Sequence, residues 1–303
     1  MTIVCCWFDE SSGRKRITAI ADARAATQAP GGSWVPLSDT TVKLFRASVK
    51  CHSMDSFQKE AGSWANPYFQ TEIGIGFAGY CFEALTVIAL LSRTLEQLVQ
   101  DGRGEPDPEP LGILNLAREI MERYFASHTN LAHQVVEILI FGFSPSTLEP
   151  WCGKVEKKPG KPSIMRDFTQ PMKSNDFLAI GDIAKETSFR ASVEKLRRRI
   201  SRHREDIAPG SGEDARFEYD VEVSRHYLAD KKIIEDLTLE KLESEFSTTV
   251  GGVLQKVEVY PTAGGAAVVS FCRDDQDFLL NGLPHVTPAS LGYVPIGEKM
   301  GRK

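Results

Sequence analysis

The sequence predicts an α+β protein, a four-layer αββα sandwich of two mainly antiparallel sheets with helix pairs on both outer faces. The expected elements run in the order strands, two helices, strands, two helices, strands. Helices that come in pairs between groups of strands do not suit a parallel βαβ sheet. They suit two stacked sheets whose outer faces are each covered by helices. The chain has 303 residues, 42% of them hydrophobic and 25% charged, which is enough for a full globular core.

The first group of strands begins near the start of the chain. Apolar runs rich in β-forming residues at 3–8 and 17–21 flank a polar segment that contains a glycine, which predicts a hairpin. Further apolar segments at 42–49 and 71–77 predict two more strands.

The first helix pair follows these strands. Residues 80–99 place Leu85 and Ile88 on one face at helical spacing. A loop rich in glycine, proline and acids at 101–110 separates this helix from a second one at about 111–127.

The rest of the chain repeats the pattern. Strands are expected at 134–143, 151–157, 163–167 and 176–181. A second helix pair is expected at 183–204 and 237–246, and the last two strands at 253–260 and 266–272. The chain is therefore expected to form one domain over residues 1–272, with an inserted helical and loop region at about 198–236 and an irregular C-terminal tail at 273–303.

Charge and cysteine content restrict the class of protein. With 36 basic and 41 acidic residues the net charge is −5, which disfavours nucleic acid as a partner because phosphate neutralisation needs a basic surface. The six cysteines form no C-x-x-C pair, so a reducing, cytoplasmic setting is expected. The first ten residues hold two acids and no Lys or Arg, unlike a signal peptide. The apolar stretch 73–91 contains Glu83 and three glycines, so no membrane span is expected.

Short motifs along most of the chain point to one family. They are Met1-Thr2, AIADAR at 19–24, VKLFR at 42–46, IGFAG at 75–79, AIGD at 179–182 and VGG at 250–252. IGFAG and AIGD each lead directly into an expected helix. In this order the motifs resemble those of the N-terminal-nucleophile hydrolases, in particular proteasome β-subunits and their bacterial peptidase relatives. The resemblance extends to about residue 272.

The resemblance implies a nucleophile at Thr2. Removal of Met1 would leave Thr2 with a free α-amino group, whose unperturbed pKa of about 7.7–8.0 leaves it substantially neutral near pH 7. Such an amine can activate the hydroxyl of its own residue. By resemblance, Lys43 is an ammonium that lowers the pKa of this amine, and Asp22 is the carboxylate that holds Lys43. The backbone N–H of Gly79 would form the oxyanion hole.

Two further residues are carried over with a departure from the family pattern. The family has a serine after its AIG motif and an acid before the later glycine pair, whereas this chain has Asp182 and Ser247 in those segments. The two residue types stand exchanged, so one carboxylate and one hydroxyl would remain near the N-terminus. Alternatively, Asp182 caps the helix expected to start at Ile183.

The resemblance also implies a substrate pocket. Its wall would draw on Ala25, Phe77, Cys81 and Leu85. These side chains are apolar, and burying an unpaired charge among them would be costly, so uncharged apolar residues are expected before the scissile bond. The alternative is that all four belong to the hydrophobic core.

Three functions stay open. The first is a threonine peptidase that acts through an acyl-enzyme on Thr2. It would work inside a self-assembled homo-oligomer, a ring or helical stack. Its substrates would be peptides or unfolded proteins, with an ATP-dependent unfoldase as a possible partner. The second is a catalytically silent subunit of the same fold for assembly or recognition, and the third a small-molecule amide hydrolase. No cofactor is expected because the chain has no Walker or dinucleotide fingerprint. No metal is expected either, since the six histidines are scattered and His128 and His133 are five apart.

Overall fold

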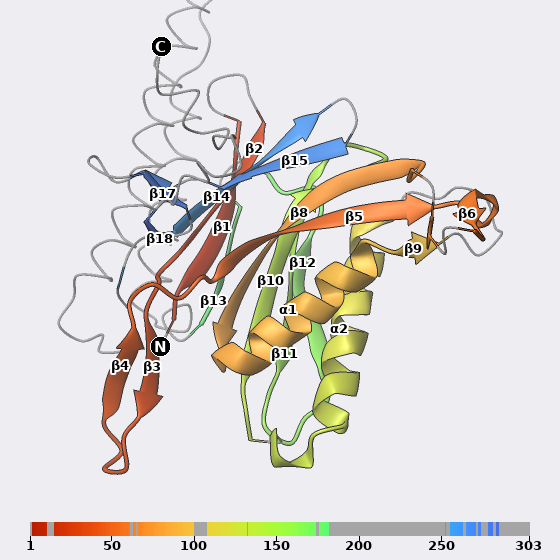
Figure 1. Cartoon of the computed structure of the whole chain (residues 1–303). Coiled ribbons are helices and arrows are strands. Elements are labelled where there is room, and N and C mark those ends of the chain that lie inside the picture. The colour runs from red at the N-terminus through yellow and green to blue at the C-terminus, as the bar shows by residue number, and fades with distance from the viewer. Residues whose placement is uncertain are drawn as a thin grey trace, which may run out of the picture.

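The chain folds into a mixed α+β structure in which strands predominate (Figure 1). The computed structural model describes residues 2–10, 15–60, 63–64, 66–99, 108–131, 133–173, 176–181, 252, 255–262, 265–270, 272–273, 278–280 and 283–284. Within these ranges there are two α-helices and two principal sheets.

The first sheet has five strands in the order β13-β1-β2-β14-β15. Its strands are β1 (Val4–Asp9), β2 (Arg16–Ala21), β13 (Phe177–Ile180), β14 (Gln255–Thr262) and β15 (Gly265–Ser270). All neighbours are antiparallel, and Val4 lies opposite both Ala21 and Ile180. This register brings the start of β1 beside the ends of β2 and β13.

The second sheet has six strands in the order β12-β11-β10-β8-β5-β9. Its strands are β5 (Leu44–His52), β8 (Phe69–Gly79), β9 (Leu98–Val99), β10 (Val136–Phe143), β11 (Pro150–Lys157) and β12 (Ile164–Thr169). Every pair is antiparallel except β5 with the short β9, which is parallel. The expectation of mainly antiparallel sheets is confirmed.

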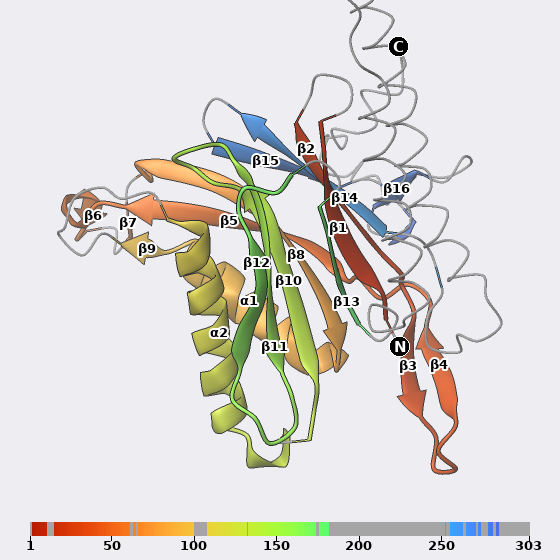
Figure 2. The ribbon, with the colours of Figure 1, turned by 180° about the vertical axis from the view of Figure 1, so that it is seen from behind.

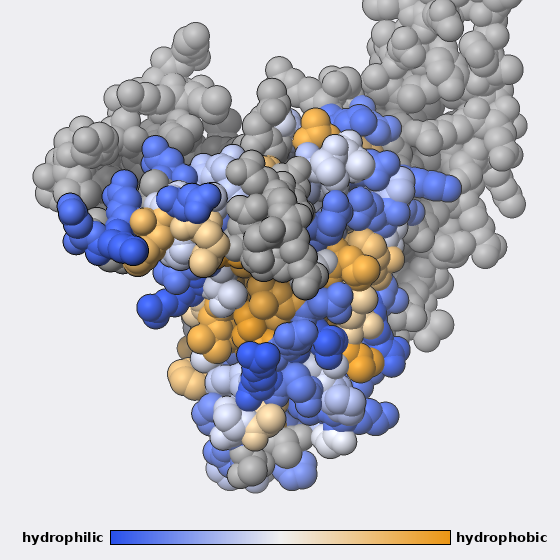
Figure 3. Space-filling view, turned by 90° about the vertical axis from the view of Figure 1, so that its right-hand side faces the viewer, coloured by the Kyte–Doolittle hydropathy of each residue, from blue (hydrophilic) through white to orange (hydrophobic). Residues whose placement is uncertain are grey.

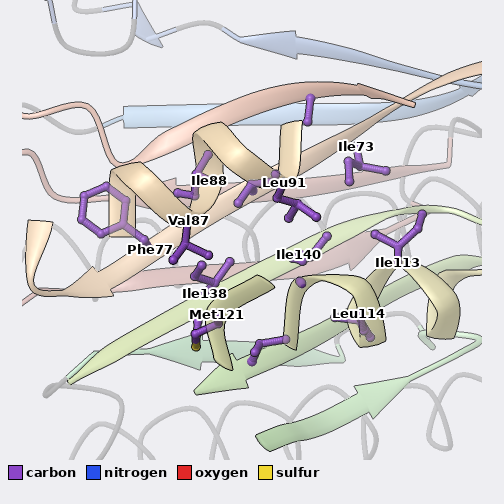
Figure 4. Packing of buried hydrophobic residues seen from close by; sticks show 14 of the residues in the cluster. Ile73, Phe77, Val87, Ile88, Leu91, Ile113, Leu114, Met121, Ile138 and Ile140 are labelled. Atoms are coloured by element: carbon purple, nitrogen blue, oxygen red, sulfur yellow. The ribbon is translucent and has the colours of Figure 1, made fainter. Parts of the chain in front are cut away.

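Helices α1 (Cys81–Leu95) and α2 (Pro110–Ala126) cover the outer face of this second sheet (Figures 1 and 4). Proline at the first position of α2 suits a helix start, since its missing N–H would have no intrahelical partner there. Apolar residues three and four apart, such as Val87, Ile88 and Leu91, project from α1 onto Ile138 of β10 and its neighbours. One of the two expected helix pairs is therefore present among the described residues.

A second core joins the two sheets to each other. Alternate residues of β1, Val4, Cys6 and Phe8, point between the sheets, because successive side chains of a strand point to opposite faces. They pack against residues of β10, and the rings of Phe8 and Phe143 meet edge to face with their centroids 6.4 Å apart. The sheets lie side by side in both ribbon views (Figures 1 and 2).

Several features differ from the sequence-based prediction. Residues 25–38, where no strand is expected from the sequence, form a hairpin of β3 (Ala25–Gln28) and β4 (Trp34–Ser38) that projects from the sandwich (Figure 1). Short pairs also form between β6 (Phe57–Gln58) and β7 (Ser63–Trp64). The tail expected to be irregular contains β17 (Phe278–Leu280) and β18 (Leu283–Pro284), and β16 (Cys272–Arg273) pairs with β17 across the expected domain boundary.

The second helix pair, expected at 183–204 and 237–246, and the insertion at 198–236 lie outside the described residues. The four-layer arrangement with helices on both faces therefore stays a prediction.

On the side of the molecule at the right of Figure 1, apolar side chains form a patch with hydrophilic ones around it (Figure 3). Neither of the two described helices is long and apolar enough to cross a membrane.

Candidate active site

The ammonium of Lys43 is the centre of a buried polar cluster. Lys43 lies immediately before β5 and is 2% exposed. Its Nζ donates to Thr2 Oγ1 at 3.1 Å, to the two carboxylate oxygens of Asp22 at 2.9 Å each, and to the carbonyl oxygen of Arg24 at 2.7 Å. The structure therefore brings three of the residues singled out in the sequence, Thr2, Asp22 and Lys43, into direct contact.

Asp22 is fully buried directly after β2. Besides the two bonds from Lys43, its carboxylate accepts the backbone N–H of Ile3 at 3.0 Å and that of Arg24 at 3.2 Å. Its own N–H donates to the carbonyl of Ile3 at 3.2 Å. A buried carboxylate with this many donors has a fixed orientation, so Asp22 holds Lys43 in place and ties it to the residue that follows Thr2.

Burial governs the charge of Lys43. Loss of hydration lowers the pKa of its ammonium below the ordinary lysine value, and the attraction of Asp22 opposes this shift without cancelling it. The nearby Cys81 thiol acts in the same direction as Asp22, whereas the positive charge of Arg24 lowers the pKa of Lys43 further. The Lys43 ammonium therefore loses its proton at a lower pH than the ammonium of an exposed lysine does.

Arg24 contributes through its backbone and was not foreseen from the sequence. Its carbonyl oxygen accepts from Lys43, while its guanidinium binds Asp39 with Nε–Oδ1 and Nη2–Oδ2 distances of 2.6 and 3.1 Å. This hydrogen-bonded pairing holds the pKa of the Asp39 carboxyl below its usual range. The two-point ion pair fixes the chain at the base of the β3–β4 hairpin, and with it the position of the carbonyl.

Thr2 precedes β1 and is partly buried. Its carbonyl oxygen lies against Gly181, where the ideal position of a Cβ would be 1.9 Å away. The N–H of Gly181 donates to Oε2 of the buried Glu137 at 2.7 Å. Glu137 was not foreseen either, although a charged residue in the otherwise apolar strand β10 is the signal that could have found it.

Gly79, the expected oxyanion donor, ends β8 with a φ of +102°. A Cβ there would lie 2.1 Å from the carbonyl oxygen of Val135, so the close approach of these two backbone segments requires glycine. The preceding residue, Ala78, lies beside Gly181, with its Cβ 3.5 Å from the Cβ position there. The end of β8 thus approaches the segment that packs on Thr2. Asp182 and Ser247 lie outside the described residues.

The four expected pocket residues are not equivalent. Phe77 is 1% exposed and stacks on Phe45 at 6.2 Å between ring centroids, within the core beneath the helices. Cys81 and Leu85 are partly buried on α1 and pack against the same core, while Ala25 is partly buried at the start of β3. Burial raises the pKa of the Cys81 thiol, and the charge of Lys43 partly offsets this. Cys81 is therefore the member of the four whose charge state is coupled to that of Lys43.

The charged groups here do not form a metal centre. Across the described ranges, no group of three or more His, Cys, Asp or Glu side chains is placed to hold a metal ion. The cluster offers a hydroxyl, a buried ammonium and a carboxylate. Such a set can activate a nucleophile and stabilise negative charge.

Comparisons with known proteins give only weak similarities. No family model and no curated protein matches the chain. Among solved structures, the Anbu (Gly-1) mutant from Hyphomicrobium sp. strain MC1 is 11% identical, with a TM-score of 0.45, over 91% of this chain and 89% of that one. The helical assembly of the Anbu complex from Pseudomonas aeruginosa is 14% identical, with a TM-score of 0.44, over 91% and 88%. Anbu (ancestral beta-subunit) from Yersinia bercovieri is 11% identical, with a TM-score of 0.40, over 89% and 87%.

Proposed function

We propose that the protein is an N-terminal-nucleophile hydrolase that cleaves peptide bonds with Thr2 after removal of Met1. The observation that carries the proposal is the 3.1 Å hydrogen bond from the buried Lys43 Nζ to Thr2 Oγ1. A lysine used only for solubility would be exposed, and one used only to balance Asp22 would not need the hydroxyl. The order of the sequence motifs supports the same proposal.

In the acylation step, the α-amine of Thr2 takes the proton of Oγ1 as that oxygen attacks the substrate carbonyl carbon. Lys43 lowers the pKa of the amine through its positive charge, so that more of it is neutral near pH 7. The oxyanion that forms would be bound by the N–H of Gly79. The protonated amine then gives its proton to the leaving nitrogen, the C–N bond breaks, and the acyl group remains on Thr2 as an ester.

In the second step, the same amine takes a proton from water as the water oxygen attacks the ester. Collapse of the intermediate breaks the bond to Oγ1 and returns the proton to it. Asp22 does not exchange protons in this scheme. It keeps Lys43 charged and in place, as its two bonds to Nζ and its backbone donors require.

The helices expected at 183–204 and 237–246 would complete the four-layer sandwich by covering the outer face of the five-stranded sheet. Cys5, Trp7 and Ile20 support this, because they point away from the inter-sheet core and yet are at most 2% exposed. The described helices contact the other sheet instead. We further propose that the protein works in the cytoplasm.

We also propose self-association into a ring or helical stack that takes peptide or unfolded-protein substrates, with an ATP-dependent unfoldase as partner. The exposed Trp34, Val35 and Leu37 of the β3–β4 hairpin support self-association, since apolar side chains gathered on a surface commonly mark an interface.

The deciding experiment combines intact mass with labelling by a threonine-directed β-lactone. The expected results are a native mass without Met1, one equivalent of label on Thr2, and no label or peptide hydrolysis in Thr2→Ala. A native mass that retains Met1 would overturn the mechanism. Loss of Met1 without labelling or turnover would favour a silent subunit, and turnover of small amides but not of peptides would favour an amide hydrolase.

A further inference from the structure

Gln255, the first residue of β14, is fully buried and forms hydrogen bonds with both the oxygen and the nitrogen of its side-chain amide. Its Oε1 accepts the backbone N–H of Lys43 at 2.8 Å and that of Leu44 at 3.2 Å. Its Nε2 donates to the carbonyl oxygen of Thr41 at 2.6 Å. One side chain of the five-stranded sheet therefore binds the three backbone groups that surround Lys43 at the start of the six-stranded sheet.

The backbone of Lys43 is held from its other side as well. Its carbonyl oxygen accepts the N–H of Phe77, on β8 of the second sheet, at 3.2 Å. Lys43 is thus bound between a side chain of one sheet and a backbone donor of the other. Its Cα has little freedom, and the reach of its side chain toward Thr2 is set by these two contacts.

The pattern of contacts requires an amide. A glutamine oxygen can accept two hydrogen bonds while its nitrogen donates. Glutamate could accept the same two bonds but could not donate to Thr41, and methionine of similar length could make none of the three. Gln255 also has the same strand parity as Val257 and Val259, which point into the apolar inter-sheet core. A polar side chain at that position would be costly without these bonds.

We propose that Gln255 is a positioning residue that sets where the Lys43 ammonium stands relative to Thr2 Oγ1, and so sets the rate at which Thr2 is acylated. Gln255 acts through the backbone of Lys43 and does not itself contact the substrate in this proposal. The inference rests on the proposed function of Thr2 for its effect on rate, but its effect on the position of Lys43 can be measured separately.

The test compares Gln255→Met and Gln255→Glu with Val155→Ala. Val155 is buried beneath the helices, away from the polar cluster, so its truncation loses stability without touching Lys43. Urea unfolding measures how closely the variants match in stability. Two properties are then read: the saturating rate constant for β-lactone labelling of Thr2, and the NMR signal of Lys43 Cε at fixed pH in protein carrying ¹³C-lysine, assigned with Lys43→Arg.

In Gln255→Met we expect the saturating rate constant to fall roughly 10- to 100-fold, because small misplacements of a reacting constellation cost this much. The reagent concentration for half-saturation should stay the same, and the Lys43 Cε signal should shift. Gln255→Glu, which keeps two of the three bonds, should lose less rate. Val155→Ala should keep the native rate constant and the native Lys43 signal despite its lower stability.

An unchanged rate constant in Gln255→Met, or a fall without any shift of the Lys43 signal, would overturn the proposal. If Gln255→Met does not fold, the same two outcomes are judged on Gln255→Glu. If the native protein itself is not labelled at Thr2, the proposed function fails, and an unmoved Lys43 signal would then show that the positioning inference has failed too.

Discussion

The backbone of Gly181 lies so close to the carbonyl of Thr2 that a methyl group on it would sit 1.9 Å from the Thr2 oxygen. Gly181 also has a φ of +96°, a conformation that side chains rarely adopt. Two independent constraints, one of space and one of backbone conformation, therefore exclude any other residue at the position that packs on the candidate nucleophile.

Gly181→Ala is expected to lose more unfolding free energy than a Gly→Ala substitution at a site where only the positive φ is unfavourable. Gly160→Ala supplies that control, because Gly160 has a φ of +65° and open space around its Cβ position. The control should lose about 1–2 kcal/mol of unfolding free energy. Gly181→Ala should lose about 1–3 kcal/mol more from overpacking, and Thr2 labelling should fall with it. Equal losses in urea unfolding would contradict the contact with Thr2.

Substitution of Asp22, which binds Lys43, should cost far more stability than substitution of Asp39, which binds Arg24. Asp22→Asn leaves the buried Lys43 without a full counter-charge, and removing one partner of a buried pair costs about 3–5 kcal/mol. Asp39→Asn weakens the exposed ion pair with Arg24 and should cost under about 1 kcal/mol. Urea unfolding of both variants is the measurement. A similar small loss in both would mean that the Asp22–Lys43 pair contributes little.

The pH dependence of Thr2 labelling should have an alkaline limb set by Lys43. Burial lowers the pKa of its ammonium below 10.5, so the proton is lost before that pH and the rate falls as pH rises through the folded-state pKa. On the acid side the rate rises as the Thr2 amine loses its proton. The labelling rate is measured across pH and corrected for hydrolysis of the reagent. A native rate still rising at pH 10.5 would contradict the role of Lys43.

Substrate preference tests the expected pocket. We expect faster cleavage after leucine than after arginine or glutamate, because the partly buried Cys81 and Leu85 of the expected pocket offer no partner for a charge. Leu85→Ala should shift preference toward larger residues, whereas Leu90→Ala, an exposed position on the same helix, should not. A peptide library read by mass spectrometry measures both. Faster cleavage after a charged residue would refute the pocket.

Asp182 and Ser247 offer a coupling test of two residues beyond the described ranges. If they are an exchanged pair that supports the Thr2 amine, Asp182→Ser and Ser247→Asp should each lower the labelling rate, and the double exchange should restore it. If Asp182 only caps a helix, Asp182→Ser should lower the melting temperature and leave the rate unchanged.

Much of the fold could be predicted from hydrophobic pattern alone. The strands expected at 134–143 and 151–157 lie within two residues of β10 and β11. The signal of β10 is strong because Glu137 is its one charged residue. The β3–β4 hairpin was missed because Ala25–Gln28 has weak strand propensity and no apolar alternation. The Pro30-Gly31-Gly32 segment does signal its turn, because proline and glycine favour turns.

The site was predictable only where side chains carry it. Thr2, Asp22 and Lys43 were named together by motif resemblance, and the structure places them in contact. The carbonyl of Arg24 could not be named, since every residue has a carbonyl and only the folded chain selects one. Gln255 did leave a signal: a polar residue at an inward position of a strand whose other inward residues are valines.

The unequal burial of the site residues has a consequence for comparing related chains. Asp22 and Lys43 are at most 2% exposed and balance each other's charge inside the fold, whereas Thr2 is only partly buried. Losing the aspartate or the lysine alone would leave the other charge buried without its partner, whereas a change of the threonine removes no buried charge. Among related chains, burial alone can therefore explain why the aspartate and lysine are kept, and the residue at the position of Thr2 is the sharper test of the proposed chemistry.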